Sequence, residues 1–433
     1  MNSTATLSKS FFLFSFCVAL SWRSWAQDGQ LTLKQVAQED IYALCGAEFA
    51  GRGYQKNGHT LAAQFLEEQF QSIGLLPVNG NYTQPFPLQV NVPQEARITI
   101  GNSTLEIGTD VILHRQSGSG EIADTKVKDL KYALKVPSDL TGKIALYRGG
   151  LPAKIAANSR KKTRYSKQAQ PGYKLQAVLA AKPEAVVILN KKLTAAFAPA
   201  SSGVPILVAQ QDSVPEKIKR MGMQVVSTQQ QLQTQNVMGM VGGTKQPDTF
   251  LVLTAHYDHL GTYEGALFAG ANDNASGIAS LLAIARHFAK NPPKYSMLFI
   301  AFGAEETGLV GSRYYVEQDQ RVPLSNMKFL LNLDLMGNGV DGIMAVGGKD
   351  FPGPYDRLVN LNEELQSVPV VKARKNAPNS DHYFFLKSGV PGFFIYTLGG
   401  PPHYHDVNDT PQNLQLSKFT EIHKLLVQFI EFF

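Results

Sequence analysis

The sequence contains little cysteine and has no long apolar run beyond its first 26 residues. Only two of the 433 residues are cysteines, and no later stretch approaches the roughly 20 apolar residues that a membrane-spanning helix needs. These absences argue against a disulfide-stapled miniprotein and against stable membrane insertion. Charged residues at 18% and aromatic residues at 10% also exclude a mainly disordered chain. We therefore expect a soluble globular protein long enough for two domains.

Residues 1–26 have the pattern of a secretory signal peptide. Lys9 precedes an apolar stretch at 11–20, and a small-x-small pattern ends at Ala26. The alternative is an uncleaved membrane anchor, which the short apolar stretch disfavours. Cleavage after Ala26 leaves Cys45 as the single cysteine, so no intrachain disulfide forms. We expect a secreted or periplasmic protein.

Two regions of the chain differ in pattern. From residue 236 onward, short apolar runs alternate with helical stretches, which predicts an α/β sandwich with a mixed, mainly parallel sheet. The predicted strands are 250–255, 297–302, 329–333 and 393–397, and the clearest predicted helices are 276–290 and 416–432. Upstream, residues 31–75 predict two helices separated by a loop at 51–53.

The insert, residues 106–235, has short β-branched runs between lysine-rich loops and predicts a separate β-rich module. Residues 27–105 and 236–433 would then form one discontinuous domain. The insert has 20 Lys and Arg against 9 Asp and Glu, whereas the rest of the chain after residue 26 has 19 against 26. We expect the insert to dock partly through charge and to border the cleft.

Chemically active side chains follow the predicted strands. In open α/β sheets, ligands bind at the carboxyl ends of the strands. Those ends carry His256, Asp258, Asp273, Glu305, Glu306, Asp334 and His405. Each alone is more often a solvated loop residue or a helix cap, but clustered buried acids need a counter-charge. Two histidines and several carboxylates on one rim favour a site for zinc or a similar divalent ion.

A single metal ion would not use all of these ligands. One aspartate can bridge two ions roughly 3.5–4 Å apart, and Asp273 is the candidate. We then expect His256 and Asp334 on one ion, and Glu306 and His405 on the other.

Glu305 and Glu306 are adjacent, so only one readily faces the metal. The other can take a proton from a metal-bound water or hydroxide and pass it to a leaving amine. Asp258 lies two residues after His256 and could orient that imidazole through its other nitrogen. An Asx turn is the alternative role for Asp258.

The motifs around these residues resemble the M28 family of zinc aminopeptidases. Six motifs occur in the family's order over about 150 residues. They are His256-Tyr-Asp-His, Gly270-Ala-Asn-Asp-Asn-Ala-Ser-Gly277, Ala301-Phe-Gly-Ala-Glu-Glu306, Asn332-Leu-Asp-Leu-Met-Gly337, Ser380-Asp-His382, and Tyr404-His405 through Thr410. The resemblance implies a phosphorylase/hydrolase-like three-layer sandwich and two zinc ions held by the five ligands named above.

The resemblance also implies roles for further residues. Glu305 becomes the general base and acid, Asp258 the partner of His256, and Tyr404 a phenol that stabilises the oxyanion. Asp381 and His382 either line the substrate pocket or serve packing. The remaining nearby residues, His259, His403 and Asp409, stay outside the expected ligand set.

The insert resembles the protease-associated domain that some members of this family carry. Runs at 140–147, 185–190 and 204–208 follow its pattern, whereas the lysine-rich loop at 160–167 has no counterpart.

Together these features predict a secreted di-zinc metallo-aminopeptidase. A metal-bound hydroxide, with Glu305 as base, would remove N-terminal residues from peptides that have a free N-terminus. We expect no nucleic-acid partner; the oligomeric state stays open. The alternatives are a glutaminyl cyclase or a carboxypeptidase on the same fold, or a non-catalytic, receptor-like interaction protein.

Overall fold

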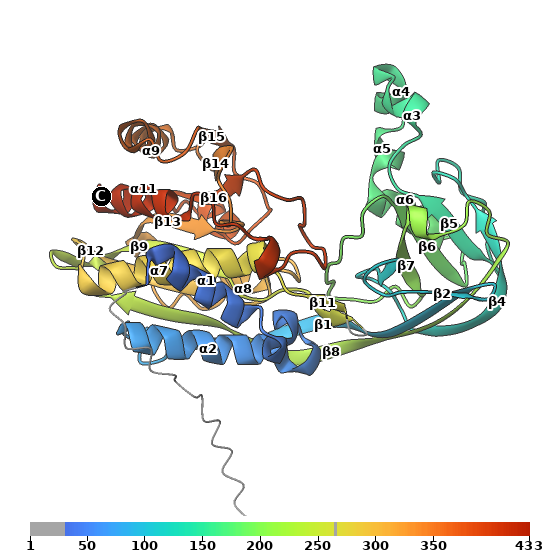
Figure 1. Ribbon diagram of the computed structural model, residues 1–433, viewed down its shortest axis with the longest axis horizontal. Coiled ribbons are helices and arrows are strands. Elements are labelled where there is room, and N and C mark those ends of the chain that lie inside the picture. Colours follow the sequence, from blue (N-terminus) through green and yellow to red (C-terminus); the bar gives the residue numbers. More distant parts are fainter. Residues whose placement is uncertain (1–30, 264–265) are drawn as a thin grey trace, which may run out of the picture.

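The computed structural model describes residues 31–263 and 266–433, so the predicted signal peptide lies outside the described residues. Figure 1 shows two bodies side by side, joined by long strands. The strands of the sandwich are β9 (Gln246–His256), β12 (Tyr295–Phe302), β13 (Met327–Leu333), β14 (Gly342–Val346), β15 (Val371–Arg374) and β16 (Gly392–Leu398). Its helices are α1 (Leu33–Leu44), α2 (Gly58–Ile73), α7 (Ser276–Lys290), α8 (Val310–Glu317), α9 (Pro352–Leu365), α10 (His382–Lys387) and α11 (Phe419–Glu431).

The sheet of the sandwich is mixed and mainly parallel, as the sequence predicts. Strands β12, β9, β13 and β16 are parallel neighbours, and β14 joins β16 in the antiparallel sense. Side chains alternate between the two faces of β9. Leu251 and Leu253 pack with α1, α2, α7, α9 and α11, whereas Phe250 and Val252 pack with α8 and α10. The result is a three-layer sandwich.

The N-terminal helices begin and end at recognisable residues. Thr32 caps α1 in a capping box with Gln35, so both side chains bond backbone N–H groups. Helix α2 ends at Gly74, whose φ of 87° favours glycine. None of the helices in the described ranges is long and apolar enough to cross a membrane.

Two long antiparallel strands, β1 (Thr83–Ile100) and β8 (Arg220–Val241), connect the bodies. Residues 237–241 of β8 pair with β12 in the sandwich, and residues 220–225 pair with β4 (Gly120–Asp129) in the insert. The strand pair therefore extends one sheet through both bodies (Figure 1). The apolar pattern of the sequence does not indicate this pair.

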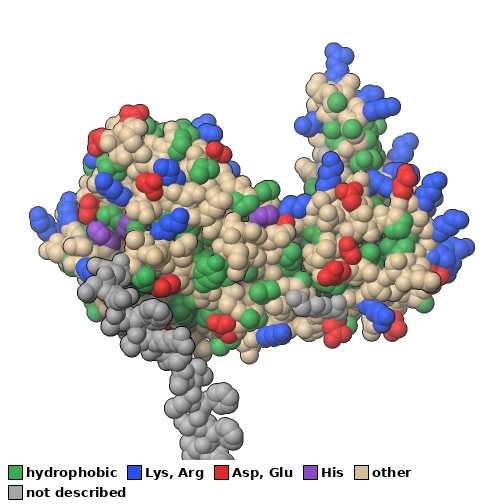
Figure 2. Space-filling model, viewed as in Figure 1, with side chains coloured by type: hydrophobic (Ala, Val, Ile, Leu, Met, Phe, Trp, Pro, Cys, Tyr) green, Lys and Arg blue, Asp and Glu red, His purple; other side chains and the backbone are tan. Residues whose placement is uncertain are grey.

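The insert holds the other end of this sheet and has an apolar core on one face of its strands. Its further strands and helices are β2 (Ser103–Leu105), β3 (Val111–Leu113), β5 (Ile144–Arg148), β6 (Ala185–Asn190), β7 (Ile206–Gln210), α3 (Ala153–Ala156), α4 (Ser159–Arg164), α5 (Ser166–Ala169) and α6 (Pro171–Leu179). Strands β4, β5, β6 and β7 are parallel, and β3 lies antiparallel beside β7. Figure 2 shows many Lys and Arg side chains over this body.

Short elements complete the chain, and all but η3, which follows β7 in the insert, lie outside residues 106–235. They are the two-stranded β10 (Gly261–Tyr263) and β11 (Ala266–Phe268), and the short helical turns η1 (Ala47–Arg52), η2 (Gln55–Asn57), η3 (Gln211–Ser213), η4 (Ala271–Ala275), η5 (Leu324–Asn326) and η6 (Pro411–Asn413).

Candidate metal centre

Four of the predicted site residues come from the carboxyl ends of parallel strands. His256 is the last residue of β9, Asp334 directly follows β13, and Glu305 and Glu306 lie three and four residues after β12. Because these strands are parallel neighbours, their ends meet at one edge of the sheet. Asp273 joins them from turn η4, which leads into α7.

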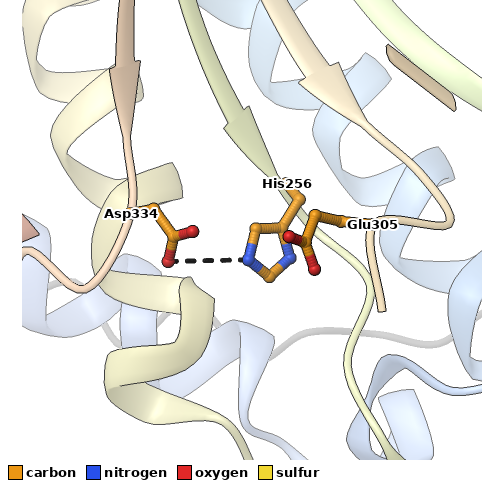
Figure 3. Close-up of side chains that lie close together, drawn as sticks. All are labelled: His256, Glu305 and Asp334. Carbon is orange, nitrogen blue, oxygen red and sulfur yellow. Dashed lines mark ion pairs between the residues drawn. The ribbon is translucent and has the colours of Figure 1, made fainter. Parts of the chain in front are cut away.

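The carboxylate of Asp273 lies between two imidazoles. Nε2 of His256 is 3.3 Å from Oδ1 of Asp273, and Nε2 of His405, from the loop after β16, is 3.0 Å from Oδ2. Asp334 Oδ1 lies 3.6 Å from His256 Nε2 (Figure 3), and Glu306 Oε2 lies 3.1 Å from His405 Nε2. The structure thus brings all five expected ligands into two groups that meet at Asp273.

The charge of this cluster fits a cationic metal site. Asp273, Glu306 and Asp334 are buried, and no Lys or Arg of the described ranges lies within ion-pair distance of them. Burial alone would lower the pKa of His405, but the Glu306 and Asp273 carboxylates raise it to about 11. The carboxylates therefore favour positive charge at this place, which a bound divalent cation would supply. The set of imidazole nitrogens and carboxylate oxygens suits zinc.

Glu305 lies close to His256 and Asp334, and the three side chains converge on the same space (Figure 3). One ligand atom from each of the three lies within 4.8 Å of the other two. Burial raises the pKa of the Glu305 carboxyl well above its usual value; His256 opposes this shift and Glu306 adds to it. A carboxyl with a raised pKa can exchange a proton near neutral pH.

Asp258 contacts the imidazole differently from the sequence-based expectation. Nδ1 of His256 hydrogen-bonds the backbone carbonyl of Asp258 at 3.1 Å, whereas the Asp258 carboxylate is 3.9 Å away. That carboxylate instead accepts hydrogen bonds from the backbone N–H groups of Glu305 and Glu306, at 3.0 and 3.3 Å, and from the Tyr54 hydroxyl. Asp258 therefore orients the imidazole through its backbone and fixes the glutamate loop through its side chain.

His259 belongs to the cluster, although it is not among the five expected ligands. Its Nδ1 lies 2.8 Å from Oε1 of Glu306, and the side chain is fully buried. His259, Asp273 and Glu306 each offer a ligand atom within 4.8 Å of the others. The signal in the sequence is its position three residues after His256, in the loop that follows β9.

Asp409, also outside the expected ligand set, shapes the turn that carries Asp273. Its two carboxylate oxygens accept hydrogen bonds from the backbone N–H groups of Asn272 and Asp273, at 2.8 and 2.9 Å. Because Asp409 lies 136 residues after Asp273, no local pattern could have indicated this contact.

A chain of hydrogen bonds orients Asp334. The Ser380 hydroxyl donates to Oδ2 of Asp334 at 2.7 Å, and the Asn332 amide donates to Ser380. The neighbouring Asp381 and His382 are fully buried. The His382 ring lies 5.1 Å from that of Phe394, which favours the packing role of the two considered for it.

The insert reaches the loop that carries His405. Nδ1 of His405 hydrogen-bonds the carbonyl of Ala195 at 2.8 Å, which leaves Nε2 for the cluster. Lys192 donates to the carbonyl of Tyr404 and lies 3.8 Å from the Asp406 carboxylate. The Tyr404 ring, which is half exposed, stacks on His405 at 3.9 Å.

Comparisons with known proteins show similarity in sequence and in fold. Residues 236–430 match the model of peptidase family M28. The chain is 30% identical over 366 residues to aminopeptidase YwaD of Bacillus subtilis, covering 76% of this chain and 71% of that protein. Over 146 residues, 33% of this chain and 28% of the other, it is 37% identical to a probable zinc metalloprotease of Pyrenophora teres f. teres. The structure of BSAP, a zinc aminopeptidase from Bacillus subtilis, superposes with a TM-score of 0.70 at 20% identity, covering 93% of this chain and 96% of that one.

Proposed function

The chain belongs to peptidase family M28 and is a zinc-dependent aminopeptidase, and from this premise we propose that it removes N-terminal residues from peptides at a centre of two zinc ions. The family resemblance and the three-layer fold predicted from the sequence are thereby confirmed. The resemblance of the insert to a protease-associated domain stays a prediction.

The observation that carries the two-ion proposal is the position of Asp273. Its two oxygens face different imidazoles, His256 on one side and His405 on the other. A carboxylate that presents each oxygen to a separate ligand group is suited to bridge two ions. Asp334 completes the first group and Glu306 the second.

Each side chain of the centre then has a distinct task. When bound, the zinc ions supply Lewis acidity to the scissile carbonyl and to the attacking water. Glu305 takes the proton of that water at a carboxylate oxygen and returns it to the leaving amine. Asp258 holds the backbone of Glu305 in place. The phenol of Tyr404 donates to the developing oxyanion.

His259 adds a partner for Glu306 in this scheme. Its Nδ1 contacts Oε1 of Glu306, whereas His405 contacts Oε2. Nδ1–H of His259 would therefore orient the carboxylate, and Glu306 would keep Oε2 for zinc.

A panel of three substrates tests the reaction class. The zinc-loaded protein should hydrolyse an aminoacyl p-nitroanilide with a free amine and leave its N-acetylated counterpart intact. Cyclisation of an N-terminal glutamine peptide would instead indicate a glutaminyl cyclase, and release of a C-terminal residue would indicate a carboxypeptidase. A zinc-free protein without turnover on any substrate would support the receptor-like alternative.

We also propose that residues 1–26 direct the protein to a secreted or periplasmic location and that residues 106–235 form an inserted domain. The apolar core on one face of the insert's strands and the link through β1 and β8 support the second proposal. Detection of mature protein beginning at Gln27 in the extracellular or periplasmic fraction would test the first.

A further inference from the structure

A loop segment of the insert, residues 192–197, contacts the loop that carries His405. The segment follows β6 and contains no helix or strand. The carbonyl of Ala195 lies 2.8 Å from Nδ1 of His405, and the backbone N–H of Ala195 donates to the carbonyl of His405 at 3.2 Å. Figure 1 shows the chain after β16 running from the sandwich towards the insert. The insert therefore restrains both the ring and the backbone of a proposed zinc ligand.

Lys192 makes further contacts with the same loop. Its ammonium group donates to the carbonyls of Pro402 and Tyr404, at 2.5 and 3.0 Å, and lies 3.8 Å from the Asp406 carboxylate. The carbonyl of Tyr404 belongs to the peptide bond that precedes His405. One side chain of the insert thus contacts the loop on both sides of the ligand.

The backbone at His405 needs such support. Its φ is 57°, in the left-handed region that residues other than glycine uncommonly adopt. A residue in this conformation persists where the surrounding contacts hold it. Residues 399–410 form no helix or strand, so no regular pattern of backbone hydrogen bonds fixes this loop. The contacts from Lys192 and Ala195 provide the restraint instead.

The segment 192–197 is itself anchored to the sandwich. Phe197 is buried, and its ring meets the ring of Tyr54 edge-on, with centroids 5.0 Å apart. Tyr54 lies shortly before α2 and donates a hydrogen bond to the Asp258 carboxylate. Because the segment is fixed in this way, Lys192 can hold the His405 loop in one position.

We propose that Lys192 is a positioning residue for the zinc ion held by Glu306 and His405, so that the insert determines how tightly this ion binds. The proposal rests on the two-zinc centre and deepens it. Without the Lys192 contacts, the loop would sample positions in which Nε2 of His405 no longer faces Glu306, and zinc would have to restore the bound position. The ion at His256 and Asp334 takes no unshared ligand from this loop and should bind as before.

Zinc binding can be measured without any turnover. Chelator competition on the metal-free protein gives one dissociation constant for each of the two ions. We expect Lys192→Met to raise one of them about 10–100-fold, the usual cost of losing an outer partner of a metal ligand, and to leave the other within about threefold. Lys192→Arg should keep much of the affinity, because a guanidinium group also donates to carbonyl oxygens.

Lys191→Met is the matched control. Lys191 is exposed and adjacent to Lys192, so this variant removes the same charge and should leave both dissociation constants unchanged. The direction of the change separates positioning from simple electrostatics. Loss of a positive charge near the centre would tighten zinc binding, whereas loss of the loop contacts weakens it. Circular dichroism confirms that each variant is folded.

The dependence of activity on zinc concentration gives an independent readout. Excess zinc should refill a site whose loop is only less well held. Lys192→Met should therefore reach a kcat near that of wild type, at a zinc concentration about 10–100 times higher. A kcat that stays low at saturating zinc would contradict a role in positioning alone.

Unchanged dissociation constants in Lys192→Met would overturn the proposal, as would an equal loss at both ions or the same loss in Lys191→Met. If the wild-type protein nevertheless bound two zinc ions and cleaved free-amine substrates, only the role of Lys192 would be refuted. A wild-type protein that bound a single zinc ion would refute the two-ion centre, and this inference with it.

Discussion

Replacing Glu305 with glutamine removes the one carboxylate of the centre to which a proton-transfer role is assigned. The shape of the side chain is kept, and the backbone N–H of residue 305 still has Asp258 as its acceptor at 3.0 Å. We therefore expect the fold and the zinc content to persist. The loss of a general base costs on the order of 10²–10⁴ in rate, which is about 3–5 kcal/mol of transition-state stabilisation.

The assay combines kcat for an aminoacyl p-nitroanilide with zinc content by mass spectrometry. Glu306→Gln is the matched control because it makes the same chemical change at the next residue, whose Oε2 lies 3.1 Å from His405. That variant should lose zinc as well as activity. The assignment of roles is refuted if Glu305→Gln turns over within about threefold of wild type, or if it loses zinc while Glu306→Gln retains it.

Two further substitutions examine positions that support the centre or the fold. Asp409→Asn should weaken zinc binding about 10–100-fold in a chelator competition, because one of the N–H groups of Asn272 and Asp273 loses its acceptor. Unchanged affinity for zinc would contradict the role of Asp409 in positioning Asp273. Burial and the neighbouring His287 lower the pKa of His423 to about 4. Between pH 6.5 and pH 4 the unfolded chain therefore binds a proton that the folded chain does not bind. The folded state becomes less stable as the pH decreases through this range. His423→Leu should therefore gain about 1–2 kcal/mol relative to wild type between pH 7 and pH 5 in urea unfolding, and a difference independent of pH would refute the argument.

The local patterns were sufficient to predict the sandwich and the strand ends at which the clustered side chains lie. The predicted helix 276–290 is α7 itself, and the four predicted strands lie within β9, β12, β13 and β16. His256 and Asp334 could be found because each sits at the end of a buried apolar run. The ends of parallel neighbouring strands lie at the same edge of a sheet, so His256 and Asp334 come together although they are far apart in the sequence.

The parts that the sequence did not predict depend on long-range contacts or on polar strands. β8 includes the polar stretch 227–235, rich in Gln and Thr, which has no apolar alternation to indicate a strand; its pairing with β1 determines it. The carbonyl of Ala195 reaches His405 across 210 residues of sequence. His259 lies in an irregular loop, where spacing does not fix the direction of a side chain.

The zinc content of the purified protein at saturation tests the proposed centre most directly. We predict two zinc ions per chain in the wild-type protein and at most one in Asp273→Ala, because that variant lacks the carboxylate that faces both His256 and His405. A wild-type protein that binds only one zinc ion, or an Asp273→Ala variant that binds two with unchanged affinity, would contradict the account.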